Sequence, residues 1–156
     1  MQAEPTSGHM WLRRLVGDWN VEAPAPDGDG TVKGTETVRT LGDFWVICEG
    51  HMVMPDGSTG QTIMTLGFDP EKGKVVGSWI GSMMTFLWLY EGTIDEAAGR
   101  LTLDSRGPAC DAAGTLADYQ DVITFEGDDA RILISRQRQP DGTWKDLFSV
   151  RYTRSG

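Results

Sequence analysis

Basic residues are scarce in this sequence. It has 14 lysines and arginines against 23 aspartates and glutamates, a formal net charge of −9. So acidic a chain has little attraction for phosphate backbones or anionic lipid surfaces, so we expect no nucleic-acid and no membrane partner. No apolar run approaches the roughly 20 residues that span a bilayer. Residues 1–8 also lack the basic and apolar regions of a secretory signal, so we expect a cytoplasmic protein.

Cysteine and histidine are equally few, with two of each. Two cysteines do not make a disulfide framework. Cys48 and His51 are three residues apart, and on a strand an odd spacing places the two side chains on opposite faces. The remaining pair, His9 and Cys110, lies far away in the sequence, so we expect no metal site. The chain also lacks a nucleophile elbow and a phosphate-binding glycine loop, and we expect no cofactor.

Glycine is abundant instead, with 20 residues spread along the chain. Turn signals such as Pro55-Asp56-Gly57 and Pro140-Asp141-Gly142 recur every 8–12 residues or so, between segments rich in β-branched and aromatic residues. About ten such segments predict an all-β, antiparallel barrel, because closing the sheet removes its edges. The expected strands span residues 19–23, 31–41, 44–54, 61–68, 75–82, 84–94, 101–105, 116–125, 131–138 and 144–153.

One short helix is expected before the strands. Met10, Trp11 and Leu15 are spaced to share one helical face between residues 9 and 16, with Ser7 as the N-terminal cap and Gly17 at the end. No linker or repeat divides the rest of the chain. We therefore expect a flexible N-terminus over residues 1–6 and a single barrel domain over residues 7–156.

The start of the first expected strand carries a resemblance. Gly17-Asp18-Trp19 resembles the Gly-x-Trp fingerprint of lipocalin-like (calycin) barrels. The resemblance implies that the indole plugs one barrel end and that an arginine of the last strand stacks across it. Arg151 and Arg154 are the candidates, and Arg154 is preferred because it lies next to the chain end. Trp19 and Arg154 would then have a structural role, closing the barrel.

Longer stretches carry a more specific resemblance. They are HMWLRRLVGDW (9–19), LGFD (66–69), WIGSMM (79–84), LWLYEG (87–92), GP (107–108), YQD (119–121), DGTW (141–144) and RYTR (151–154). In these motifs the chain is similar to the DUF1579 family, bacterial proteins of unknown function placed among calycin-like barrels, which implies this fold and no activity.

Some ten-stranded calycin relatives, the nitrobindin-like barrels, bind haem through a histidine near the chain end. No histidine follows His51 here, so haem is not expected.

A barrel of this size encloses either packed side chains or one small ligand. In the expected strand 44–54, Trp45, Glu49 and His51 share one face, while the other face is apolar. Because binding cavities combine apolar walls with a few polar groups, we predict that the mixed face lines the cavity. The alternative is that this face meets solvent and the methionine face is core. Further predicted wall residues are Met64, Trp79, Trp88, Tyr90 and Tyr119, although a packed core uses the same residue types.

Three functions remain open. The leading one is binding of a small apolar or amphipathic molecule inside the barrel. The second is an isomerase, lyase or hydrolase on the same barrel, with His51 as catalytic base and Glu49 orienting it. The third is a filled barrel that acts as a protein-interaction module. Apolar residues on both faces of one strand also make a homodimer a prediction.

Overall fold

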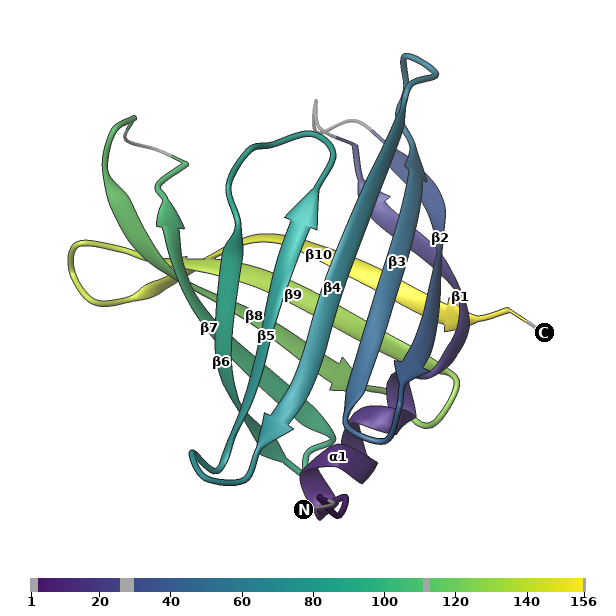
Figure 1. The fold of residues 1–156 in the computed structure, drawn as a ribbon. Coiled ribbons are helices and arrows are strands. Elements are labelled where there is room, and N and C mark those ends of the chain that lie inside the picture. Colours follow the sequence, from purple (N-terminus) through teal and green to yellow (C-terminus); the bar gives the residue numbers. More distant parts are fainter. Residues whose placement is uncertain (1–2, 26–29, 111–112, 156) are drawn as a thin grey trace.

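The barrel predicted from the strand spacing is present. The computed structural model describes residues 3–25, 30–110 and 113–155. Within these residues, ten antiparallel strands follow one another around a closed barrel, in which β1 contacts both β2 and β10 (Figure 1). The strands are β1 (Gly17–Pro24), β2 (Thr31–Leu41), β3 (Trp45–Val53), β4 (Thr59–Asp69), β5 (Lys74–Gly81), β6 (Trp88–Asp95), β7 (Arg100–Pro108), β8 (Leu116–Phe125), β9 (Ala130–Arg138) and β10 (Trp144–Arg154).

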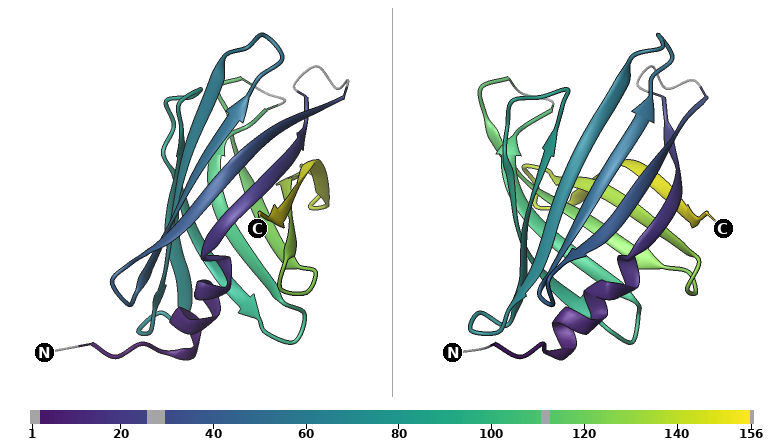
Figure 2. Two further views of the ribbon diagram at one scale, coloured as in Figure 1. Left: turned by 90° about the vertical axis from the view of Figure 1, so that its right-hand side faces the viewer. Right: turned by 45° about the vertical axis from the view of Figure 1, so that its right-hand side comes forward.

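The predicted helix crosses one end of the barrel. It consists of α1 (Ser7–Leu12) and a 3-10 turn, η1 (Arg13–Leu15), and Figure 2 shows both lying against the same barrel end in two further views. The helix begins two residues earlier than predicted, and Thr6 rather than Ser7 is its N-cap. The reason is local: the backbone N–H of Thr6 donates to His9 Nδ1 at 2.9 Å, which fixes the first turn.

The helix-covered end of the barrel is filled. Leu12 and Leu15 each retain 1% of their accessible surface and Trp19 retains none, and they join a cluster of inward-facing aliphatic residues. Burial of this apolar surface is the main source of stability at this end. The other fully buried members are Leu66, Val75, Leu101, Leu103 and Ile123.

Two strand predictions were wrong. The expected strand 84–94 begins only at Trp88, because the chain turns after Gly81, where the N–H of Met84 donates to the Gly81 carbonyl. Residues 84–87 are therefore a loop. In contrast, β7 includes the expected break at Gly107-Pro108, where Gly107 pairs with Ala117, and ends at Pro108. A glycine fits there because the rings of Trp88 and Phe86 occupy the space of a side chain.

The barrel is not equally closed along its length. β1 and β10 pair only between Trp19 and Glu22 on one strand and Arg151 and Arg154 on the other. The first half of β10 pairs with β9 alone, and Figure 1 shows it diverging from β1. A β-bulge between Asp146 and Phe148 accompanies the divergence. The end opposite the helix is consequently the open end.

Candidate functional site

The open half of the barrel contains a cavity of about 640 Å³. The barrel's own side chains therefore do not fill it, and a space of this size suits one small organic molecule. Its lining residues come from the strands and from the loops at the open end. They are Val21, Ala23, Thr35, Glu36, Gly50, Met52, Thr62, Met64, Trp79, Met84, Thr85, Phe86, Trp88, Tyr90, Ser105, Pro108, Ala109, Cys110, Tyr119, Asp121, Leu133, Ser135, Leu147, Phe148, Val150 and Tyr152.

An aromatic row forms one wall of this cavity. The rings of Phe86 and Trp88 meet edge to face with centroids 4.9 Å apart, and Trp88 meets Tyr119 in the same way at 5.0 Å. The Trp88 indole N–H points to Met84 Sδ at 3.3 Å, and the Tyr119 hydroxyl donates to the Pro108 carbonyl at 2.5 Å. With their polar atoms engaged by the protein, these side chains present apolar ring surface to the cavity.

A buried tyrosine–aspartate pair interrupts the apolar wall. The Tyr90 hydroxyl on β6 donates to Asp121 Oδ2 on β8 at 2.5 Å. Burial raises the pKa of Asp121, while hydrogen bonds from Tyr90 and Ser135 oppose that rise. Burial, followed by the nearby Asp121 charge, raises the pKa of Tyr90 well above its ordinary value. This pair puts a carboxyl group of perturbed acidity into an otherwise apolar wall.

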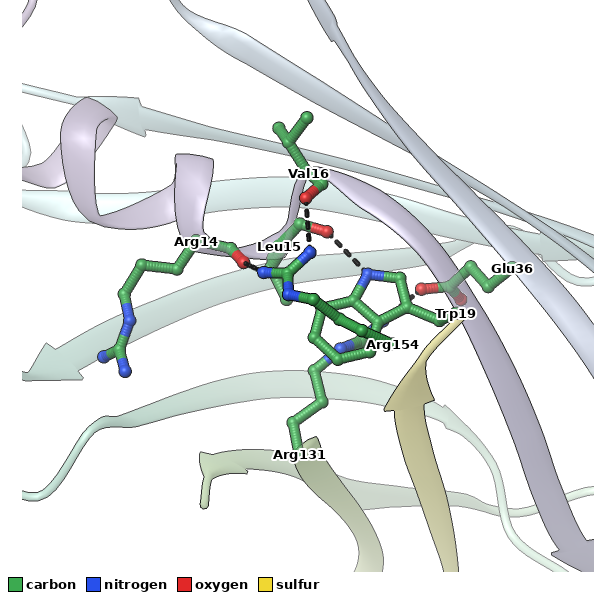
Figure 3. Close-up of polar contacts among 7 residues, drawn as sticks. All are labelled: Arg14, Leu15, Val16, Trp19, Glu36, Arg131 and Arg154. Carbon is green, nitrogen blue, oxygen red and sulfur yellow. Dashed lines mark hydrogen bonds and ion pairs between the residues drawn. The ribbon is translucent and has the colours of Figure 1, made fainter. Parts of the chain in front are cut away.

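The cavity ends against a layer of stacked charges and rings (Figure 3). The Arg131 guanidinium lies 4.7 Å from the Trp19 ring and 3.8 Å from the Tyr152 ring, and its Nη2 pairs with Glu36. Arg131 is 2% exposed, so the pair is buried. The Arg131 Nε has no hydrogen-bond partner among the described residues. Within this layer, Glu36 and Tyr152 line the cavity.

The other face of the Trp19 indole carries the predicted arginine. Arg154 stacks on it at 4.2 Å and donates to the carbonyls of Val16 at 2.8 Å and Arg14 at 2.7 Å (Figure 3). The Trp19 N–H donates to the Leu15 carbonyl at 2.8 Å. The arrangement that the Gly-x-Trp resemblance implied is therefore present. It connects the helical segment to the first and the last strand of the barrel, β1 and β10.

The approach of Arg154 explains one glycine. Gly17 has φ +135°, and a Cβ at this position would lie 2.5 Å from Arg154 Nη1. Any other residue would be strained in its backbone and would displace the guanidinium.

Five predicted wall residues line the cavity, namely Met64, Trp79, Trp88, Tyr90 and Tyr119. The structure brings them together from β4, β5, β6 and β8. Their contact with a ligand stays a prediction. Met84 and Phe86, which lie in the expected strand 84–94, also line the cavity, but from a loop instead of a strand.

The predicted wall on β3 was wrong. Trp45 is 43% exposed on the outer face, while its neighbours Val46 and Cys48 are buried inside. Trp45 packs over Gly67 of β4, whose missing side chain leaves room for the indole. Glu49 and His51 share this outer face and border a small surface hollow of about 260 Å³, and Glu49 is bonded to Arg39 at 3.3 Å. The predicted catalytic pair of His51 and Glu49 therefore does not reach the cavity.

Sequence reasoning missed the polar residues of the cavity. Glu36 shares one face of β2 with Val32, Gly34 and Val38. Asp121 shares one face of β8 with Tyr119 and Ile123. An acidic residue on an otherwise apolar strand face was the available signal in both strands. Tyr152 carried no such signal, because a tyrosine is ordinary on either face of a strand.

The described residues show neither a metal centre nor a membrane span. In residues 3–25, 30–110 and 113–155, no three potential metal-ligating side chains lie together. Cys48 is buried inside the barrel wall and His51 is exposed outside it. None of the helices in these ranges has the length and apolar character to cross a bilayer.

Known structures share the fold. Rv2717c from M. tuberculosis superposes with a TM-score of 0.60 at 14% identity, covering 98% of this chain and 100% of its own. The S-type phycobiliprotein lyase CPES from Guillardia theta superposes with a TM-score of 0.53 at 13% identity, covering 97% and 99%. At such identities the likeness shows the barrel alone.

Sequence comparison identifies a protein family but no activity. No curated protein matches the chain. The model of a family described as "Protein of unknown function (DUF1579)" matches residues 4–154, nearly the whole length. The chain therefore belongs to the DUF1579 family.

Proposed function

We propose that this protein binds a small apolar or amphipathic molecule in the open half of its barrel. The observation that carries the proposal is the unfilled 640 Å³ cavity, whose apolar wall is interrupted by a few convergent polar groups. Burying an apolar body against Trp88, Tyr119 and Met64 supplies affinity, and the polar groups fix its orientation.

The alternatives receive less support. A filled barrel would leave no cavity, so a protein-interaction role loses its structural premise. An enzyme that used His51 and Glu49 would have to work on the outer surface, where Glu49 already faces Arg39. Cytoplasmic location, a homodimer, and the lack of a nucleic-acid or membrane partner stay predictions.

Native mass spectrometry is the first test of the binding proposal. The gently purified protein should carry a reproducible extra mass of a small molecule, which is lost on denaturation. The same spectrum gives the oligomeric mass and tests the predicted homodimer. A bare protein that also takes up no apolar probe would overturn the proposal.

A matched pair of variants on β1 tests the location. Ala23 lines the cavity, whereas Glu22 faces outward and forms an exposed ion pair with Lys33 at 3.7 Å. Ala23→Trp should reduce binding of the neutral fluorescent probe N-phenyl-1-naphthylamine by about tenfold or more, because the indole fills the site. Glu22→Trp adds the same bulk outside and should leave binding unchanged. Equal effects, with both variants folded by circular dichroism, would place the probe elsewhere.

A further inference from the structure

The cavity has a one-sided charge inventory. Among the described residues that line it are two carboxylates, Glu36 and Asp121, but no lysine, arginine or histidine. The nearest buried cation, Arg131, is stacked between Trp19 and Tyr152 and pairs with Glu36. A ligand carboxylate or phosphate would find no cationic partner on these walls.

The polar groups beside the aromatic wall already have partners. The Tyr90 hydroxyl donates to Asp121, and the Tyr119 hydroxyl donates to the Pro108 carbonyl. A carboxylate has about four lone-pair sites, so Asp121 keeps acceptor capacity beyond its bonds from Tyr90 and Ser135. Asp121 can therefore accept a hydrogen bond from a ligand's polar end, while the hydroxyls of Thr35, Thr62 and Ser105 also line the cavity.

The aromatic side chains of the cavity also favour a positively charged ligand. Trp79, Trp88 and Tyr90 come from the adjacent strands β5 and β6, and all three line the cavity with Asp121. Ring faces attract cations, and a carboxylate beside them offsets the cost of removing the charge from water. Farther out, Phe86 and Phe148 continue the cavity with apolar surface.

From these observations we infer that the cavity selects an amphipathic cation, with an ammonium-type end at Asp121 and an apolar body directed toward Phe86 and Phe148. The inference rests on the proposed function and specifies its ligand class. The net charge of −9 adds a long-range attraction for the same class of molecule.

The test compares three ligands of one chain length. Decylamine, decanol and decanoate compete for bound N-phenyl-1-naphthylamine at about pH 8, where the first is a cation and the last an anion. Decylamine should displace the probe at a concentration about tenfold lower than decanol, with decanoate weakest. If decanol or decanoate binds as tightly as decylamine, the inference is overturned while the binding proposal stands. A failure of the probe itself to bind removes the binding proposal instead.

Two variants on β8 separate the pairing from general charge. Asp121→Asn should weaken decylamine about tenfold and leave decanol unchanged. Asp118→Asn makes the same charge change on the outer face, where Asp118 pairs with Arg106 at 2.8 Å, and should alter neither. Equal losses in the two variants would overturn the inference. Glu36 is unsuited to this test, because its neutralisation would leave Arg131 buried without its ion partner.

A pH series on the unaltered protein needs no variant. Asp121 accepts a hydrogen bond from Tyr90 of β6 and interacts electrostatically with Tyr152 of β10, which also lies beside the Glu36 and Arg131 charges of β2 and β9. Burial raises its pKa, so protonation on lowering the pH removes the negative partner. Decylamine affinity should therefore fall as the pH is lowered from about 8 toward the ordinary aspartate pKa of about 4, with the loss beginning above that value, while decanol affinity stays constant. A decylamine affinity that does not change with pH contradicts pairing to this carboxylate.

Discussion

Two arginines hold the Trp19 indole from opposite faces, and their surroundings give them different roles. Arg131 is buried, and its charge is balanced by Glu36 at the base of the cavity. Arg154 is partly exposed, and its guanidinium donates hydrogen bonds to backbone carbonyls at the end of the helical segment. Arg131 lies in the layer that ends the cavity, and Arg154 connects the helical segment to the last strand.

Replacing Arg154 measures that fastening. Arg154→Ala should lower the free energy of unfolding by about 2–4 kcal/mol, because it removes a cation over an indole and leaves the Val16 and Arg14 carbonyls without a donor. Arg151 lies on the same strand but forms an exposed ion pair with Glu126 at 2.9 Å. Arg151→Ala should therefore cost less than about 1 kcal/mol. Urea unfolding of both variants decides, and equal losses would contradict the closing role of Arg154.

The sequence could identify Trp19 and Arg154 because their residue types and positions carry a known fingerprint. It could not tell which face of β3 points inward, because Trp45 and Ile47 on the outer face are as apolar as Val46 and Cys48 on the inner one. Hydrophobic alternation fixes a strand's orientation only when one face is polar. On β2 and β8 the inner face itself contains an acidic residue. The rule that apolar residues face inward and polar residues face solvent therefore fails to predict the polar part of the cavity.

At the scale of elements, the loop between β5 and β6 matters most for the site. Met84, Thr85 and Phe86 line the cavity, whereas Leu87 is 52% exposed outside it. The sequence predicted strand here because the run from Met83 to Tyr90 is apolar. An apolar loop residue is unusual unless it covers something, and here the loop extends the aromatic wall at the open end.

The same loop supplies a matched comparison. Phe86→Ala should weaken binding of N-phenyl-1-naphthylamine about 5- to 30-fold, because apolar contact at the open end is lost. Leu87→Ala removes an apolar side chain from the same loop without touching the cavity and should bind normally. Fluorescence titration checks both. A loss confined to Leu87→Ala would show that the loop's outer side carries the binding.

For the whole molecule, the barrel has its shortest strand pairing between its first and last strands, β1 and β10. This boundary between β1 and β10 is called the seam. Trp144–Val150 pairs on one side only, whereas residues 151–153 pair with both β9 and β1. Ala23 on β1 and Leu147 and Phe148 on β10 line the cavity where this pairing ends. The opening along the seam thus adjoins the proposed binding site.

Hydrogen exchange should reveal this gradient. Amides of residues 144–150 that point away from β9 should exchange at least about tenfold faster than those of residues 151–154, because no register partner on β1 protects them. Bound N-phenyl-1-naphthylamine should slow exchange along the seam more than in β3. Uniform protection along β10 would mean that the seam is closed in solution.

The number of strands, their antiparallel order and the end-capping helix could all be predicted, because turn chemistry and strand composition are local properties. The extent of the seam could not, because it depends on how far two strands separated by more than a hundred residues stay together. The cavity depends on that separation as much as on any lining residue.

The stacking of Arg154 on Trp19 also has a consequence for biosynthesis. Translation produces the indole near the beginning of the chain and its guanidinium partner near the end. Until the last strand leaves the ribosome, the first strand has β2 on one side and an open edge on the other. Because the barrel cannot close before then, its interior becomes sheltered only after β10 has been synthesised. Any ligand captured during folding must arrive after β10 has left the ribosome.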